Sequence, residues 1–283
     1  MKIAISTEST LDIPKELQQK FDISVIPYLV ILGDKSAPDG EITPQDIFDF
    51  VDKTGQLPKT SAINEYQYDQ YFTKLLKKYD AVIHIALSSG ISSSIQNAIH
   101  AASIMQNVYV VDSKSLSSGI ALLAIYGRKL ADKGLEPQEI VEKLEARVPF
   151  VQASFVINSL NYLYKGGRCS GLARFSAMLF RIKPQILVKD GKMIPGKKYQ
   201  GRSERTVVSY CDDTLEEFNS PDLSIAFVTH SHATPEMVAI CKQKLVERGF
   251  KTIYETLAQA TITSHCGPKT IGILYINDGM KED

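Results

Sequence analysis

The sequence predicts an α/β fold of two lobes, with a mainly parallel sheet in the first and a mixed sheet in the second. Short apolar runs alternate with segments of helical period along the chain, which is typical of consecutive strand and helix units. Of the 283 residues, 44% are hydrophobic and 23% are charged, which indicates a globular chain rather than a disordered one. The pattern changes near residue 150, so we expect lobes at 1–150 and 151–283.

In the first lobe, apolar runs predict strands at residues 2–6, 24–32, 81–87 and 107–112. A helix should precede the third strand, because large apolar residues recur there at three- and four-residue spacing and share one helical face. These residues are Tyr68, Tyr71, Phe72, Leu75, Leu76 and Tyr79. Further helices are expected at 92–104 and 116–133, where Gly134 ends the second and Pro137 opens another.

The second lobe is expected to begin with a strand at 153–157 and a helix at 160–164, which the pair Gly166-Gly167 breaks before a further helix. Asp190-Gly191 is a hairpin signal between two strands. The remaining elements are helices at 203–218 and 235–249 and strands at 223–230, 251–256 and 272–277.

Composition excludes several classes of function. The 32 basic and 32 acidic residues cancel, so no overall field draws the chain to DNA or to an anionic membrane. Four well-separated cysteines argue against a disulfide framework or a thiolate zinc site and favour a reducing cytoplasm. We find no signal peptide, no membrane span and no glycine-rich nucleotide loop, and His230 and His232 lack further metal ligands. We therefore expect no cofactor and no metal.

The strongest local feature is Ser88-Ser89-Gly90-Ile91-Ser92-Ser93-Ser94, between a buried strand and the start of a helix. A helix start offers unpaired backbone N–H groups to an anion, and a glycine lets a ligand approach the backbone. One serine that caps the helix is the alternative, but five hydroxyls exceed what capping requires.

Two weaker signals accompany the serine-rich loop, which we define as residues 88–94. Thr60-Ser61 follows Pro58 and is equally explained as a helix N-cap. His265 lies in a predicted turn before the last strand and is able to donate to an anion.

Basic residues concentrate between Lys165 and Arg205, a segment that contains eleven Lys and Arg residues and only two acidic residues, Asp190 and Glu204. Such a segment suits a phosphate or an acidic protein partner, and a solvated surface is the alternative. The basic residues are Lys165, Arg168, Arg174, Arg181, Lys183, Lys189, Lys192, Lys197, Lys198, Arg202 and Arg205.

Several motifs, in this order and spacing, resemble the DegV family, the fatty-acid-binding subunits of bacterial fatty acid kinase. They are Pro58-Lys59-Thr60-Ser61, the strand and serine-rich loop at 85–94, Asp112-Ser113, Leu160-x-Tyr162-Leu163-x-Lys165-Gly166-Gly167-Arg168, Ile182-Lys183-Pro184, Asp190-Gly191-Lys192 and His265-x-Gly267-Pro268. The resemblance spans nearly the whole chain.

The resemblance implies two α/β lobes that enclose one long-chain fatty acid, with its tail in an apolar tunnel and its carboxylate near the cleft between the lobes. Its carboxylate contacts correspond to Thr60, Ser92 and His265, beside the further hydroxyls of Ser61 and Ser93. Its arginines correspond to Arg168 and to Arg202, the latter associated with the kinase partner and phosphoryl transfer.

The implied role is non-catalytic. A separate kinase subunit would bring ATP and Mg²⁺, and this chain would present the carboxylate for conversion to an acyl phosphate that feeds phospholipid synthesis. Burial of the acyl chain stabilises such a complex by roughly 0.8 kcal/mol per CH₂, while the carboxylate needs hydrogen-bond donors. The implied partners are the fatty acid and the kinase, with no stable nucleic acid and at most transient contact with a membrane.

This chain departs from the family pattern at three places. Glu8 stands where the family usually has aspartate, Ser93-Ser94 where it has Gly-Thr, and Lys269 where it has glycine. Because serine has less backbone freedom than glycine, the shape of the carboxylate pocket is the feature most exposed to change.

Two other functions remain open on the sequence. A serine hydrolase would use Ser92, His265 and an acid such as Asp222, although residues 90–94 lack the second glycine of a nucleophile elbow. A nucleic-acid-binding regulator would use the basic segment.

Overall fold

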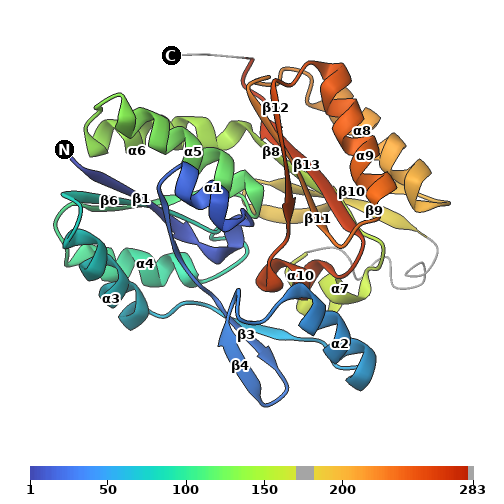
Figure 1. Ribbon diagram of the computed structural model, residues 1–283, viewed down its shortest axis with the longest axis horizontal. Coiled ribbons are helices and arrows are strands. Elements are labelled where there is room, and N and C mark those ends of the chain that lie inside the picture. The colour runs from blue at the N-terminus through green and yellow to red at the C-terminus, as the bar shows by residue number, and fades with distance from the viewer. Residues whose placement is uncertain (170–181, 280–283) are drawn as a thin grey trace.

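The computed structural model describes residues 1–169 and 182–279 and forms a layered α/β structure (Figure 1). The first sheet is parallel, with strand order β2-β1-β6-β7. Its strands are β1 (Ile3–Glu8), β2 (Ile23–Ile26), β6 (Ala81–Ala86) and β7 (Val108–Asp112). Its helices are α1 (Lys15–Lys20), α3 (Glu65–Leu76), α4 (Ser94–Ser103), α5 (Ser118–Asp132) and α6 (Pro137–Arg147).

The second sheet is mixed, with order β10-β9-β8-β13-β11-β12, and only β11 and β12 pair in parallel. Its strands are β8 (Val151–Val156), β9 (Lys183–Lys189), β10 (Lys192–Tyr199), β11 (Ile225–Ser231), β12 (Thr252–Leu257) and β13 (Thr270–Ile276). Its helices are α7 (Asn161–Gly166), α8 (Ser203–Glu217), α9 (Pro235–Arg248) and α10 (Ala260–Cys266). The fold class, a parallel sheet followed by a mixed one, is confirmed.

A third, smaller sheet has the order β4-β3-β5 and is antiparallel. It consists of β3 (Leu29–Leu32), β4 (Lys35–Pro38) and β5 (Lys59–Ser61), and it lies beside α2 (Pro44–Thr54) at the bottom of Figure 1. Two 3₁₀ turns, Ser9–Leu11 and Val148–Phe150, complete the described elements. The sequence did not predict this sheet, because its strands are only three or four residues long.

Helix α5 lies between the two large sheets and contacts β1 and β6 on one side and β8, β11 and β13 on the other. Ten of its 15 residues are buried, as expected for a helix that is apolar on all sides. The largest buried cluster accordingly joins Leu123 of α5 with Ile5 of the first sheet and Leu274 of the second. The two halves of the chain thus share one core, and the boundary at residue 150 stays a prediction.

Most predicted elements are present, with ends shifted by a few residues. The hairpin at Asp190-Gly191 is confirmed, since both residues have positive φ (49° and 77°), as a two-residue type I′ turn requires. The single strand predicted at residues 24–32 is wrong. Pro27 lacks an N–H and divides the run into β2 and β3, which belong to different sheets. The helix predicted after Gly167 falls largely on residues 170–181, outside the described residues.

Candidate functional site

The serine-rich loop leaves the carboxyl end of β6, next to the carboxyl end of β1. The order β2-β1-β6-β7 makes this the point where successive strands of the parallel sheet are added in opposite directions. Ligands bind at such a switch point in open α/β sheets, because the loops after the two central strands diverge there and leave a crevice. The topology therefore puts the predicted anion site where the sheet opens.

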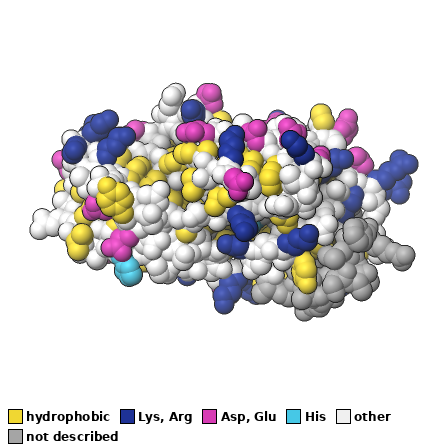
Figure 2. Space-filling model, turned by 90° about the horizontal axis from the view of Figure 1, so that it is seen from below, with side chains coloured by type: hydrophobic (Ala, Val, Ile, Leu, Met, Phe, Trp, Pro, Cys, Tyr) yellow, Lys and Arg dark blue, Asp and Glu magenta, His cyan; other side chains and the backbone are white. Residues whose placement is uncertain are grey.

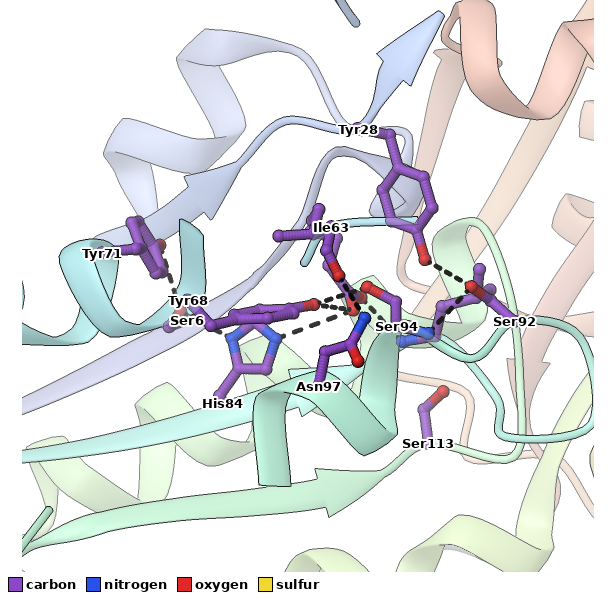
Figure 3. Close-up of polar contacts among 12 residues, drawn as sticks. Ser6, Tyr28, Ile63, Tyr68, Tyr71, His84, Ser92, Ser94, Asn97 and Ser113 are labelled. Carbon is purple, nitrogen blue, oxygen red and sulfur yellow. Dashed lines mark hydrogen bonds and ion pairs between the residues drawn. The ribbon is translucent and has the colours of Figure 1, made fainter. Parts of the chain in front are cut away.

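Of the serines in the loop, Ser92 is the best placed to donate a hydrogen bond to a ligand. Its Oγ accepts from the backbone N–H of Ser94 at 3.1 Å and lies 3.0 Å from the hydroxyl of Tyr28 (Figure 3). A hydroxyl has two acceptor lone pairs and one proton. When Tyr28 donates, both lone pairs of Ser92 are occupied, and its proton is left for a ligand.

The hairpin between β9 and β10 closes the other side of the loop. Ser88 Oγ donates to the carbonyl oxygen of Gly191 at 2.7 Å, and a Cβ on Gly90 would collide with that same oxygen. Gly90 therefore permits a close backbone approach. Asp112 accepts from the backbone N–H of Ser89 at 3.2 Å, so two of the sequence motifs serve to hold this loop.

Thr60 and His265 meet across the fold, with 2.8 Å between Thr60 Oγ1 and His265 Nε2. Thr60 belongs to β5, and the N-cap of α3 is Asn64, so the N-cap alternative for Thr60-Ser61 is wrong. His265 lies in the last turn of α10 rather than in the predicted turn. Ser61 Oγ donates to the carbonyl oxygen of Ala62 at 3.4 Å and does not line the cavity described below.

The glycine pair after α7 shapes the surroundings of His265. A Cβ on Gly166 would lie 2.9 Å from His265 Nδ1, so the helix end is able to reach the imidazole only without a side chain there. Gly167 caps α7 in the left-handed region (φ 68°). On the other side of His265, a Cβ on Gly267 would collide with the ring of Tyr162. These close contacts explain the glycines on physical grounds.

A cavity of about 170 Å³ brings the predicted residues together. Thr60, Ser92, Ser93, Arg168 and His265 all line it. Most of the remaining lining is apolar and comes from both large sheets and the helices beside them. The apolar lining includes Leu87, Ile91, Leu116, Phe155, Leu163, Met193, Ile262 and Leu274. A cavity that combines hydrogen-bond donors with apolar side chains is what an amphipathic acid requires.

Electrostatics keep His265 neutral at physiological pH. Burial and, to a smaller degree, the nearby positive charge of Arg168 together lower its pKa to about 4. Nδ1 of this ring has no hydrogen-bond partner among the described residues. A bound carboxylate would supply the missing negative charge beside the imidazole and Arg168.

Two arginines predicted to act at the site occupy different positions. Arg168 is exposed and also lines the cavity, so this side of the cavity communicates with solvent. Its Nη1 donates to the carbonyl oxygen of Gly166 at 2.6 Å. Arg202 is exposed at the start of α8 and does not line the cavity.

The predicted hydrolase triad is not assembled. Ser92 pairs with Tyr28, and His265 with Thr60. Asp222 accepts from Arg147 Nη2 at 2.7 Å and lines a separate, much smaller cavity. A triad needs the acid bound to the histidine and the histidine bound to the serine, so the alternative with these three residues is wrong.

The basic segment is divided among different surroundings in the described part of the chain. Lys197 pairs with Asp213 at 2.7 Å and Lys183 donates to Ser203 at 2.7 Å, while Arg174 and Arg181 lie outside the described residues. On the face seen in Figure 2, Lys and Arg side chains alternate with acidic and hydrophobic ones. None of the described helices is both long and apolar enough to cross a membrane.

Sequence reasoning missed Tyr28 and Glu8 as parts of the site's support. Tyr28 follows Pro27 between two strands, and only the folded chain brings its hydroxyl to Ser92, 64 positions away. Glu8 is entirely buried and was noted only as a departure from a pattern. The signal for Glu8 was a charged residue at the end of an apolar strand.

Comparisons with known proteins identify the family and the fold. Residues 2–278 match the family model described as "Uncharacterised protein, DegV family". A fatty acid-binding protein of Thermotoga maritima is 29% identical over 281 residues, which cover 96% of each chain. The structure of DegV, a fatty acid binding protein from Bacillus subtilis, is 27% identical with a TM-score of 0.85, over 98% of this chain and 100% of that one. A DegV family protein from Thermus thermophilus has the same fold, with a TM-score of 0.90 at 24% identity, over 98% of this chain and 100% of that one.

Proposed function

This chain belongs to the DegV family, and from that premise we propose that it binds one long-chain fatty acid and presents the carboxylate to a separate ATP-dependent kinase subunit. The observation that carries the proposal is that Thr60, Ser92, Ser93, Arg168 and His265 line one cavity whose remaining lining is largely apolar. Relatives described as fatty acid-binding proteins support the ligand class.

The carboxylate is held by short-range donors. The hydroxyl of Ser92 donates a hydrogen bond to it. Thr60 and the neutral His265, which are hydrogen-bonded to each other, lie beside it, and Ser93 adds a further hydroxyl. Arg168 supplies the positive charge from the solvent side. Charge-assisted hydrogen bonds of this kind are roughly twice as strong as neutral ones, which offsets the cost of removing the carboxylate from water.

The acyl tail is proposed to extend from these donors along the apolar side chains of the cavity and into an apolar tunnel. Each buried CH₂ contributes roughly 0.8 kcal/mol, so a long chain binds far more tightly than a short one. The side chains that contact its first carbons include Ile91, Leu163 and Ile262, which line the same cavity as the donors.

Phosphoryl transfer requires a partner. The kinase brings ATP and Mg²⁺, and the carboxylate oxygen attacks the γ-phosphorus while the bond from that phosphorus to the bridging oxygen breaks and ADP leaves. The product is an acyl phosphate destined for phospholipid synthesis. Arg202 lies exposed outside the cavity, where it is free to contact the kinase or the transferring phosphoryl group. This chain positions the nucleophile and stabilises charge, and it does no chemistry alone.

The test is mass spectrometry of the protein purified without added ligand, under native conditions and after organic extraction. We expect one fatty acid per chain. A Ser92→Ala, His265→Ala double variant should retain much less of it, because two head-group contacts are lost. A parent protein that carries no acid, and takes up none when oleic acid is supplied, would contradict the proposal. Retention of DNA at physiological salt would instead favour the nucleic-acid-binding alternative.

A further inference from the structure

The buried carboxylate of Glu8 bonds directly to the residue before the serine-rich loop and, through Tyr68, is linked to the last residue of the loop. Its Oε2 accepts from the backbone N–H of Leu87 at 2.7 Å, immediately before the loop begins. Its Oε1 accepts from the hydroxyl of Tyr68 at 2.8 Å. That hydroxyl lies 2.8 Å from Ser94 Oγ, the last residue of the loop.

Figure 3 shows the geometry of this arrangement: the Tyr68 hydroxyl and Ser94 point toward each other, with Ser92 on the far side of Ser94. Since Tyr68 donates to Glu8, its oxygen is free to accept from Ser94 Oγ. The backbone N–H of Ser94 in turn donates to Ser92 Oγ. Hydrogen bonds, together with the covalent structure of Ser94, therefore connect Glu8 to the hydroxyl of Ser92, which lines the cavity.

The cost of burying Glu8 suggests that the contact does more than fill space. Glu8, Tyr68 and Ser94 are each fully buried, and an acid in such a place needs several hydrogen bonds. Two of these hydrogen bonds come from Leu87 and Tyr68, while His84 Nε2 lies 3.7 Å from Glu8 Oε1, beyond hydrogen-bond distance. An apolar residue would fill the same space without this cost, but it would leave the N–H of Leu87 unpaired and the loop untied.

We infer that Glu8 is a positioning residue for the ligand's carboxylate, acting through Tyr68 and Ser94 to hold the serine-rich loop in the shape that aims Ser92 into the cavity. The inference rests on the proposed function, because it assigns Glu8 to the recognition of an acid head group. The hydroxyls of the loop face the head group, whereas Ile91 contacts only the first carbons of the tail. Loss of these hydrogen bonds should therefore weaken the binding of a fatty acid more than the binding of the fatty alcohol of the same length.

The chain offers a matched control on the same helix. Tyr71 is also in α3 and its hydroxyl is also hydrogen-bonded, accepting from Ser6 Oγ at 3.1 Å. No hydrogen bond joins Tyr71 to the serine-rich loop among the described contacts. Tyr68→Phe and Tyr71→Phe each remove one hydroxyl from α3. Only Tyr68→Phe removes the hydrogen bonds that link Glu8 to Ser94.

The experiment measures the affinities of oleic acid and oleyl alcohol for the purified full-length chain. Tyr68→Phe should weaken the binding of oleic acid about tenfold and that of oleyl alcohol less than twofold. One buried hydrogen bond is lost, and the neutral hydroxyl of the alcohol depends less on oriented donors than the carboxylate does. Ser94→Ala should have the same effect on both affinities, and it replaces Tyr68→Phe as the test if that variant does not fold. Tyr71→Phe should change neither ligand by more than twofold.

A conservative variant separates positioning from charge. Glu8→Gln keeps an oxygen for the Leu87 N–H and an amide for Tyr68, so both ends of the loop stay tied and the preference for the acid should survive within threefold or so. The inference would be overturned if Tyr68→Phe weakened the binding of acid and alcohol equally, or if Tyr68→Phe and Ser94→Ala both left the preference for the acid unchanged. A parent protein that shows no preference for the acid would instead remove the proposed function and the inference with it.

Discussion

Thr60 Oγ1 lies 2.8 Å from His265 Nε2, although the two residues are 205 positions apart. The contact joins β5 of the small sheet to α10, which precedes the last strand of the mixed sheet. Neither residue alone marks a site, because a threonine before a helix and a histidine in a short helix are both ordinary. Their contact lies on a cavity that Ser92 also lines, and we propose that this part of the cavity receives the head group.

Stability should depend on pH through His265. Burial lowers the folded-state pKa to about 4, while an unfolded histidine titrates near 6.5. The unfolded chain therefore binds more protons between these values. The stability that neutral His265 provides is complete above about pH 6.5 and is lost as pH falls towards 4, by up to about 3 kcal/mol.

Urea unfolding of the parent and of His265→Gln at several pH values measures this effect. The difference in unfolding free energy between the two should change in favour of the variant as pH falls from 7 to 4. His100→Gln alters an exposed histidine and should give a much smaller pH-dependent difference. Parallel pH profiles for the parent and His265→Gln would show the prediction to be wrong.

Gly166 and Gly167 should respond oppositely to alanine. In Gly166→Ala the new methyl lies against His265 Nδ1, so we expect fatty acid binding to fall at least fivefold, with stability nearly unchanged because alanine favours the helix by about 1 kcal/mol. In Gly167→Ala the methyl meets nothing within 4 Å, but the left-handed backbone should cost about 1 kcal/mol.

Thermal unfolding and ligand titration of both variants distinguish the two effects. Gly167→Ala serves as the control for binding, since it should melt earlier yet keep its affinity. Full affinity in a folded Gly166→Ala protein would mean that the imidazole tolerates displacement and is not a close ligand contact.

Lys269 should be replaceable by glycine with a gain in stability. Its φ of 59° lies in the left-handed region, which strains a residue that carries a Cβ, and its side chain is exposed. Lys269→Gly should therefore raise the free energy of unfolding by about 0.5 to 1 kcal/mol. Lys269→Ala keeps the Cβ and the strain, so it should give no gain in the same urea titration. Equal effects of the two variants would rule out backbone strain as the cause.

Arg168 and Arg202 should separate binding from transfer. Arg168 lines the cavity and Arg202 does not, so Arg168→Ala should weaken fatty acid binding several-fold and Arg202→Ala should leave it unchanged. With the kinase subunit, ATP and Mg²⁺, Arg202→Ala should lower acyl phosphate formation at saturating fatty acid. Turnover equal to that of the parent would exclude a role for Arg202 in docking or transfer.

Local physics explains which elements the sequence predicts well. The buried residues of α3, Tyr68, Phe72 and Leu75, lie on the face that their spacing indicates, and Asp190-Gly191 makes the expected turn. The division of residues 24–32 into β2 and β3 is harder to predict, because apolar residues continue on both sides of Pro27 and only its missing N–H marks the break.

The sequence alone determined the alternation of strands and helices, the serine-rich loop and, through motif order, the family. Only the tertiary structure decided that α10 is a helix, because a seven-residue segment with three β-branched residues is too short to be stable alone. Its first amides donate to carboxylates far away in the chain: Ala260 N–H to Asp39 at 2.9 Å and Gln259 N–H to Asp12 at 2.7 Å. Local spacing carries no information about such partners, and for the same reason it did not reveal that Glu8 braces the loop or that His265 meets Thr60.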